Sequence, residues 1–296
     1  MGHRVYICGF AGGGRENLTV EWFLRRHGYS RHIITGLKRT EDGIFRNGVR
    51  AWTSQAVHAG DVIETHLVET EPSDGILPRP VPFSVVYEDD DILVVDKPAD
   101  TPIHPSIGNY ENTLANGIAW YFEQKGEPFV YRCINRLDRD TTGLIVLAKH
   151  ALSAAVLSQA MRSREIHRTY QAFALGETAA SGTIDAPIAR LNGSLIQRTV
   201  DFASGERSVT HYRTLAHCSV FSHLELNLET GRTHQIRVHM AYIGHPLLGD
   251  TLYNKTPGTF PRQALHSASL SFVHPITGEP LNFHAPLPED MQNLLT

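Results

Sequence analysis

The sequence predicts an α+β protein in which a mixed, largely antiparallel sheet follows a small N-terminal α/β module. Short apolar stretches after position 84, separated by turn residues and by a few helical patterns, are typical of hairpin-linked strands. A proline-rich stretch near position 75 interrupts these patterns. The chain has 296 residues, of which 41% are apolar, and this is enough for about two domains with cores of their own.

Helical spacing and two capping residues predict the start of the N-terminal module. Val20, Phe23 and Leu24 fall on one helical face, and Gly28 can end that helix in a left-handed conformation. Ser30 is a suitable N-cap for a second short helix. That helix is expected to bury three apolar side chains, those of Ile33, Ile34 and Leu37.

A hairpin and a strand are expected to complete the module. Asn47 and Gly48 can supply the positive φ angles of a tight turn within residues 44–49. A last strand is expected over residues 61–67. The helices carry five basic side chains that favour an RNA-binding role: Arg25, Arg26, Arg31, Lys38 and Arg39.

Charge is unevenly distributed along the chain. The formal net charge of −4 does not indicate a nucleic-acid partner, but residues 15–50 hold eight basic and four acidic side chains. A basic segment on an acidic body is typical of a module that contacts phosphates. An ordinary solvated face would give the same count, and on charge alone that simpler interpretation is favoured.

The clearest boundary in the chain is a stretch with four prolines in residues 71–82. Prolines stiffen the backbone and remove hydrogen-bond donors, so this stretch predicts a linker. We therefore expect an N-terminal domain over 1–70, a linker over 71–83 and a second domain over 84–296.

The second domain is expected to be built mainly from strands. A polar run, Asp89–Asp91, separates two apolar stretches and predicts a turn. Three adjacent acids could also suggest a metal site, but no histidine is near in sequence and the turn is favoured. Helices are expected over 152–161 and 233–243. Strands are expected over 85–87, 92–96, 143–148, 169–175, 224–228, 265–273 and 280–285.

Dense charge borders one of the buried strands. Asn135–Gly143 places several charged residues directly before an apolar run, and charges at the end of a core strand are costly unless they are paired. Such a loop is a candidate site. The simpler interpretation is a polar loop in which Asp140 caps a turn through Thr141 or Thr142.

A second charged loop, Glu229–His239, runs into the predicted helix over 233–243. A glycine before Arg232 permits close backbone approach, and an arginine there can bind a carboxylate with both nitrogens. If Arg232 pairs with Asp138, that acid stays ionised and is suited to act as a nucleophile or base.

His234 and His239 raise the question of a metal site. They are five residues apart, about 140° round a helix, so they do not share a face. No glutamate between them could act as a base, which disfavours a zinc hydrolase. The two histidines are expected to hydrogen-bond with backbone or phosphate groups.

These segments together resemble the RluA-type family of RNA pseudouridine synthases. Arg136–Leu144 is similar to the family signature, and three further pieces in family order are Asp96–Pro98 with His104–Pro105, Arg168–Tyr170 and Gly231–His239. The resemblance covers about residues 85–285. It implies the catalytic fold of that family, an isomerase acting on RNA without metal or organic cofactor, and an N-terminal domain of the type found in ribosomal small-subunit protein four (S-four-type).

The resemblance also implies roles for single residues. Asp138 matches the essential aspartate, Tyr170 the aromatic residue that stacks on the target uracil, and Arg232 the arginine that pairs with the aspartate. It further implies that Arg136 helps hold the place of the flipped nucleotide and that Ile236 packs on the base. Arg139 and His234 are two further candidates for substrate binding.

Simpler roles exist for some of these residues. Tyr170 and Ile236 could be core residues only, and Arg136 could bind phosphate only. Two positions depart from the family pattern. Asn135 stands where many members have histidine, and Asp100 stands where glycine is frequent, so the loop after Lys97 is expected to differ in shape.

The sequence leaves three candidate functions for this protein. The first is an RNA pseudouridine synthase, acting on large-subunit ribosomal RNA in preference to transfer RNA. The second is an inactive RNA-binding protein of the same fold, and the intact Asp138, Tyr170 and Arg232 argue against it. The third is a hydrolytic nucleosidase or glycosidase using Asp138 and Asp140, for which no second acid with a raised pKa is evident.

Other features bound the class of protein. Three widely spaced cysteines disfavour a disulfide framework or a cysteine zinc site. No apolar run approaches the ~18 residues that span a bilayer, and residues 1–14 lack the layout of a signal peptide. We therefore expect a cytoplasmic protein with no membrane partner, and a monomer by default.

Overall fold

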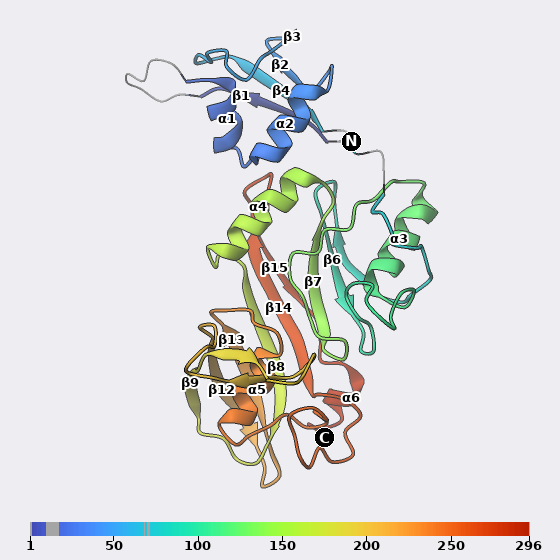
Figure 1. The fold of residues 1–296 in the computed structure, drawn as a ribbon, viewed down its shortest axis with the longest axis vertical. Coiled ribbons are helices and arrows are strands. Elements are labelled where there is room, and N and C mark those ends of the chain that lie inside the picture. The colour runs from blue at the N-terminus through green and yellow to red at the C-terminus, as the bar shows by residue number, and fades with distance from the viewer. Residues whose placement is uncertain (1, 10–17, 68, 70–71, 296) are drawn as a thin grey trace.

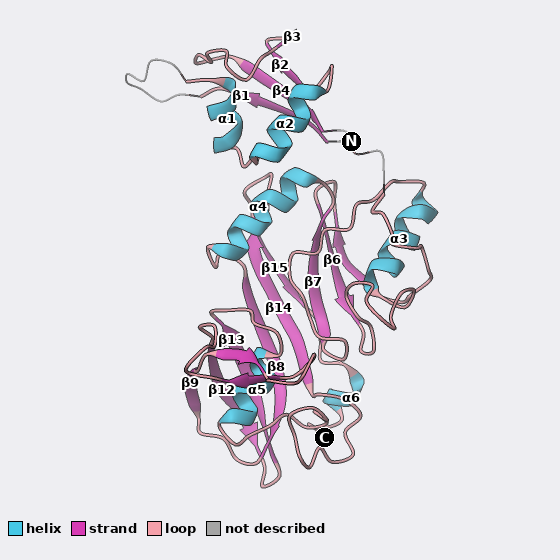
Figure 2. Cartoon of the chain, viewed as in Figure 1, coloured by secondary structure: helices cyan, strands magenta, loops and turns pink. Residues whose placement is uncertain are grey.

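The computed structural model describes residues 2–9, 18–67, 69 and 72–295. Glu71, the first residue of the expected linker, and residues 10–14 of the N-terminal stretch lie outside the described residues. Figure 1 shows a small N-terminal module at one end of an elongated body built on a large sheet. Figure 2 shows that strands dominate this body and that helices flank it.

The N-terminal module is a four-stranded sheet with two helices. Its strands follow the order β1-β4-β2-β3. The elements are β1 (Gly2–Ile7), α1 (Val20–Arg26), α2 (Arg31–Arg39), β2 (Ile44–Arg46), β3 (Val49–Arg50) and β4 (Val62–Leu67). The expected helices and hairpin are present, whereas β1, which pairs antiparallel with β4, was not expected from the sequence.

Local chemistry determines where these elements begin and turn. The Ser30 hydroxyl accepts a hydrogen bond from the Ile33 amide and caps α2. Asn47 and Gly48 have φ angles of 55° and 75°, as a tight hairpin turn requires. The apolar faces of α1 and α2 are buried against the sheet in a core of their own.

The body is a nine-stranded sheet with strand order β5-β6-β7-β14-β8-β13-β12-β9, and β15 pairs with β14. Only β7 and β14 are parallel among the described pairs, so the expected mixed, largely antiparallel sheet is confirmed. Its strands are β5 (Ser84–Glu88), β6 (Ile92–Lys97), β7 (Thr142–Ala148), β8 (His167–Leu175), β9 (Ser181–Asp185), β12 (Val209–His217), β13 (Phe221–Leu228), β14 (Leu265–Val273) and β15 (Pro280–His284).

Four helices and a small ribbon accompany this sheet. The expected helices are α4 (Ala151–Arg162) and α5 (Gln235–Tyr242). α3 (Leu114–Lys125) was not expected, because its buried residues include a glycine and an asparagine that weaken the helical pattern. The remaining elements are α6 (Glu289–Gln292) and the ribbon of β10 (Ile188–Arg190) and β11 (Arg198–Val200). No helix of the described chain is long and apolar enough to cross a bilayer.

Charged and apolar contacts join the module to the body. The Arg4 guanidinium pairs with Asp91, which also bonds with His150 at 2.7 Å. Leu152, at the start of α4, is fully buried in the same core as α1 and α2. Asp89 accepts bonds from the amides of Asp91 and Ile92, which confirms the expected turn between β5 and β6.

The parallel contact of β7 with β14 depends on Gly143. Its φ is +110°, and a Cβ there would lie 2.3 Å from the Ser267 backbone oxygen on β14. No other residue type could occupy this position without moving the strands. Because β7 follows the charged loop directly, this contact also fixes where that loop emerges from the sheet.

We predict that Gly143→Ala lowers the free energy of unfolding by roughly 2–4 kcal/mol, through backbone strain and overlap with β14. Gly36→Ala is the control, since Gly36 lies in α2 with open space around it. It should leave stability unchanged or raise it by up to ~1 kcal/mol. Urea unfolding of both variants measures the difference, and equal midpoints would contradict the prediction.

Candidate active site

Three segments meet in one pocket on the body. Its lining includes the loop before β7, with Arg136 and Asp138; Tyr170 from β8; and the stretch from Arg232 into α5. The structure therefore brings together most residues that the sequence singled out. The predicted residues that line the pocket are Arg136, Asp138, Tyr170, Arg232, His234 and Ile236.

Asp138 is paired with Arg237, which lies on α5. Arg237 Nη1 donates to Asp138 Oδ2 at 3.0 Å, while Nε and Nη2 donate to the two carboxylate oxygens of Asp250 at 2.7 and 2.9 Å. Asp250 is fully buried and Arg237 nearly so. One guanidinium thus ties the charged loop to a second carboxylate, with bidentate geometry on the buried side.

The charge on this guanidinium is strongly favoured. Burial opposes it, but the hydrogen bonds to Asp250 and the negative charges of Asp138 and Asp250 outweigh that cost and raise the pKa of Arg237. Tyr253 adds a ring face 5.1 Å from the guanidinium carbon. Asp138 therefore faces a permanent cation whose position is fixed on its other side.

The expected pairing of Asp138 with Arg232 is wrong in this structure. Arg232 pairs instead with Glu206, and its Nε donates to the Arg207 carbonyl at 3.4 Å. Arg232 lies in the exposed loop before α5, whereas Arg237 lies inside the helix on the face that meets Asp138. An arginine between apolar Ile236 and Val238 was a signal that this position is buried and needs acidic partners.

Gln235 shapes the loop that carries Arg232. Its Oε1 accepts hydrogen bonds from the Arg232 amide at 3.0 Å and from the Thr230 hydroxyl at 2.8 Å. Its amide nitrogen donates to the carbonyl of Val209 and to Thr210 on β12. The sequence analysis gave this residue no role, although a buried amide with every bond satisfied rigidifies its surroundings.

Tyr170 and Ile236 form the apolar wall of the pocket. Both are 4% exposed and belong to the main core cluster. They border the pocket that holds Asp138, so their placement suits contact with a flat base as well as core packing. Arg136 is exposed at the rim.

The two histidines have separate environments. His234 Nδ1 lies 2.8 Å from the Tyr253 hydroxyl and its Nε2 3.9 Å from Asp138 Oδ1; burial lowers its pKa, against the attraction of Asp138. His239 Nε2 donates to the Ala186 carbonyl at 2.8 Å. This backbone bond of His239 was expected, and the two rings do not converge on a metal site.

Comparison with known proteins identifies the family. The model of the family described as RNA pseudouridylate synthase matches residues 91–242. A Bacillus subtilis (strain 168) protein named "Uncharacterized RNA pseudouridine synthase YjbO" is 39% identical over 279 residues, covering 94% of this chain and 98% of that protein. The chain belongs to the RNA pseudouridylate synthase family. It is therefore an isomerase that acts on RNA.

Two more relatives extend this result. "Ribosomal large subunit pseudouridine synthase D" of Vibrio cholerae is 43% identical over 251 residues, which are 79% of this synthase and 76% of the relative. The solved structure titled "Human RNA Pseudouridylate Synthase Domain Containing 1" superposes with a TM-score of 0.59 at 26% identity, and covers 73% of this chain and 86% of that one. The body thus has the pseudouridine synthase fold.

A buried lysine of the synthase supports the loop that carries Asp138. Lys97 is fully buried at the end of β6, and its Nζ donates to the carbonyls of Pro98 and Arg139, both at 2.7 Å. Burial lowers its pKa to about 7, although Asp140 and Asp138 act in the opposite direction. A neutral amine still has two donors, which matches the two carbonyls it contacts.

Three residues that the sequence singled out lie next to this support and not among the residues that line the pocket. Arg139 is exposed and pairs with Asp100 on the neighbouring loop, so the structure does not place it as a substrate-binding residue. Asp100 has a φ of 54°, a conformation that favours glycine, which is the residue frequent at this position in the family. Asn135 is buried and bonds with the backbone of Leu144 and Val146, a structural role.

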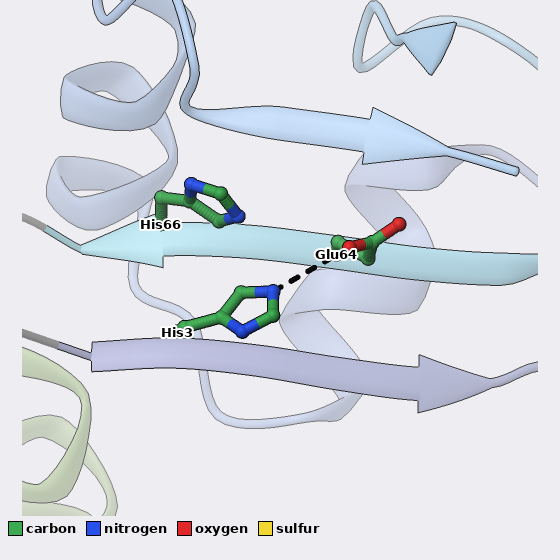
Figure 3. A group of neighbouring side chains, drawn as sticks. All are labelled: His3, Glu64 and His66. Atoms are coloured by element: carbon green, nitrogen blue, oxygen red, sulfur yellow. Dashed lines mark ion pairs between the residues drawn. The ribbon is translucent and has the colours of Figure 1, made fainter. Parts of the chain in front are cut away.

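Groups of metal-ligand type lie away from the pocket. Within the described ranges there are two: His3, Glu64 and His66 on β1 and β4, shown in Figure 3, and Asp89, Asp91 and His274. The first includes a His3–Glu64 pair at 3.4 Å, and in the second Arg4 pairs with Asp91, which also bonds with His150. Neither group borders the residues that line the pocket.

We predict that substitution of Arg237 lowers activity and stability far more than substitution of Arg232. Arg237→Gln leaves Asp138 and buried Asp250 without a cation, and should reduce kcat/KM at least 100-fold and stability by about 3–5 kcal/mol. Arg232→Gln should change stability by less than ~0.5 kcal/mol and act mainly on KM. Pseudouridine formation and thermal unfolding measure both. Equal losses of kcat in folded Arg237→Lys and Arg232→Lys variants would contradict this.

A pH prediction follows from Lys97. Folding lowers the pKa of Lys97 from its ordinary value to about 7. Between these two pKa values the unfolded chain binds more protons than the folded chain does. The contribution of Lys97 to the free energy of unfolding therefore rises with pH through that window. The difference in free energy of unfolding between the wild type and Lys97→Met should therefore grow in favour of the wild type from pH 7 to 10. Urea unfolding at several pH values measures it, and a constant difference would contradict the assignment.

Proposed function

We propose that this synthase converts specific uridines of structured RNA, in large-subunit ribosomal RNA in preference to transfer RNA, into pseudouridine, with Asp138 as the reacting carboxylate. The observation that carries the proposal is one carboxylate, held by Arg237, in a pocket walled by Tyr170 and Ile236. The ribosomal target rests on relatives named for the large subunit, which are 41–43% identical. A transfer RNA target is the alternative.

The reaction needs few groups from the protein. The bond between ribose C1′ and uracil N1 breaks, C1′ bonds to C5 of the same base, the C5 proton leaves and N1 gains a proton. Atoms balance without water or an external donor, unlike the paired carboxylates and water of glycosidases. A single carboxylate next to a fixed cation therefore suffices for either attack on the ribose, addition to the base or removal of a ribose proton.

The apolar wall suits the remaining requirements. The target base must leave its stack, at a cost of a few kcal/mol that contacts in the pocket repay. Tyr170 is proposed to stack on the extruded uracil and Ile236 to pack on it, while their burial keeps water from the detached base. Arg136, Arg232 and His234 lie where they can contact the nucleotide and its phosphates.

The N-terminal module is proposed to be an S-four-type RNA-binding domain over 1–70, joined by the linker 71–83 to the catalytic domain 84–296. In support, the predicted basic side chains on α1 and α2 are exposed. Some already make surface contacts, such as the Arg25–Glu21 pair at 2.8 Å. A cytoplasmic location and a monomer complete the proposal. The five basic residues are Arg25, Arg26, Arg31, Lys38 and Arg39.

The test uses RNA labelled with tritium at uracil C5. The wild type should release tritium, and Asp138→Asn should reduce the rate at least 10⁴-fold, because the reacting carboxylate is lost. Asp185→Asn, which changes an exposed carboxylate on β9, is the matched control and should retain activity. RNA binding without tritium release by the wild type would favour an inactive RNA-binding protein, and release of free uracil would favour a nucleosidase.

A further inference from the structure

A second groove opens next to the catalytic pocket. It encloses about 480 Å³ between the end of α4, the start of β8 and the loop before α5. Arg136, Tyr170 and Arg232 line both this groove and the pocket, so the two spaces are continuous. The volume lies within the ~300–1,000 Å³ of small-molecule sites, and is enough for a nucleotide unit.

The groove is strongly basic, in contrast to the acidic chain. Its lining contains one acidic residue, Glu229, which is already engaged by Arg164 at 3.2 Å and by Arg207 at 2.9 Å. A concentration of positive charge in a chain of net charge −4 is a local feature that favours a polyanionic ligand. The arginines in the lining are Arg136, Arg162, Arg164, Arg168 and Arg232.

Arg168 is the decisive residue of this groove. Its Nε is buried and has no hydrogen-bond partner, and no ion pair of its guanidinium is found among the described residues. A buried donor without a partner costs about 1–3 kcal/mol, and a site that retains such a donor is suited to a ligand that supplies the acceptor. A guanidinium binds phosphate oxygens with two parallel hydrogen bonds.

The position of Arg168 relates it to the target base. Arg168 and Tyr170 are two residues apart on β8, so their side chains leave the same face of the strand about 6.5 Å apart. That spacing is close to the length of one nucleotide. The guanidinium lies beside the loop before α5, since a Cβ built on Gly231 would be in van der Waals contact with it, 3.4 Å from Arg168 Nη2.

We propose that this groove binds the RNA backbone beside the target uridine, and that Arg168 holds a phosphate next to the nucleotide extruded onto Tyr170. The proposal deepens the proposed function and rests on it for the identity of the polyanion. Arg162 also lines a cavity between α4 and the N-terminal module that includes Arg25 and His32. The same strand of RNA therefore has a basic route from the pocket towards the module.

Binding is measured apart from catalysis, with a fluorescein-labelled RNA hairpin that carries uridines in its loop. Arg168→Gln should raise Kd about 10-fold and reduce the slope of log Kd against log salt by roughly 0.7–0.9, one phosphate contact. Arg168→Lys keeps the charge and should keep the slope, with a smaller rise in Kd. Arg213→Gln, on exposed Arg213 paired with Glu225 outside the groove, is the control and should change neither.

Steady-state kinetics complete the test, since a phosphate contact should raise KM while kcat stays within about threefold. If Arg168→Gln and Arg213→Gln give the same Kd and salt slope, the groove proposal is overturned even where the wild type forms pseudouridine. If the salt slope falls but the wild type forms no pseudouridine, the phosphate site stands and the proposed function fails. Arg168→Lys binding with the Kd and slope of Arg168→Gln would also overturn it, because that pattern indicates lost structure.

Discussion

The geometry of the proposed active site depends on a single buried guanidinium. Arg237 is held on one side by Asp250, whose carboxylate also accepts hydrogen bonds from the amides of Leu252 and Tyr253, and presents its remaining nitrogen to Asp138. The loop that carries Asp138 is thereby joined, through one cation, to a segment about 100 residues further along the chain. Because removing Arg237 would leave the buried carboxylate of Asp250 without its cation and Asp138 without its partner, the arrangement depends on this guanidinium.

The large sheet determines where that cation meets its partner. β7 and β14 are parallel and approach closely at Gly143. This contact directs the preceding loop towards Tyr170 on β8, the strand that pairs with β14 on its other side. Lys97 and Arg262 then hold the same loop through the carbonyls of Arg139 and Asp140. The backbone that follows Asp138 is thus held at two consecutive carbonyls, while the Asp138 side chain, paired with Arg237, lines the pocket.

The sequence predicted local turns and helix caps better than it predicted which distant residues and strands pair with one another. Ser30 and the Asn47–Gly48 turn were predicted because caps and tight turns depend on neighbouring residues alone. The choice between Arg232 and Arg237 as partner of Asp138 depends on which face of α5 is buried, and spacing within the motif does not contain that information. β1 was missed for a similar reason, since its pairing partner β4 lies more than fifty residues away.

The arginines in and around the site differ in burial, and their burial determines what each can do electrostatically. Arg237 is buried, and the negative charges of Asp138 and Asp250 compensate its positive charge. It can therefore orient Asp138 but adds little long-range attraction for RNA. Arg136, Arg162 and Arg164 are exposed, where salt screens each charge but several together attract a polyanion. Arg168 lies between these extremes: it is partly buried, and its Nε has no hydrogen-bond partner. Such a fixed guanidinium can form strong hydrogen bonds with a phosphate. A chain of net negative charge can therefore bind RNA locally, because its positive charge is concentrated where the backbone must pass to bring one base to Asp138.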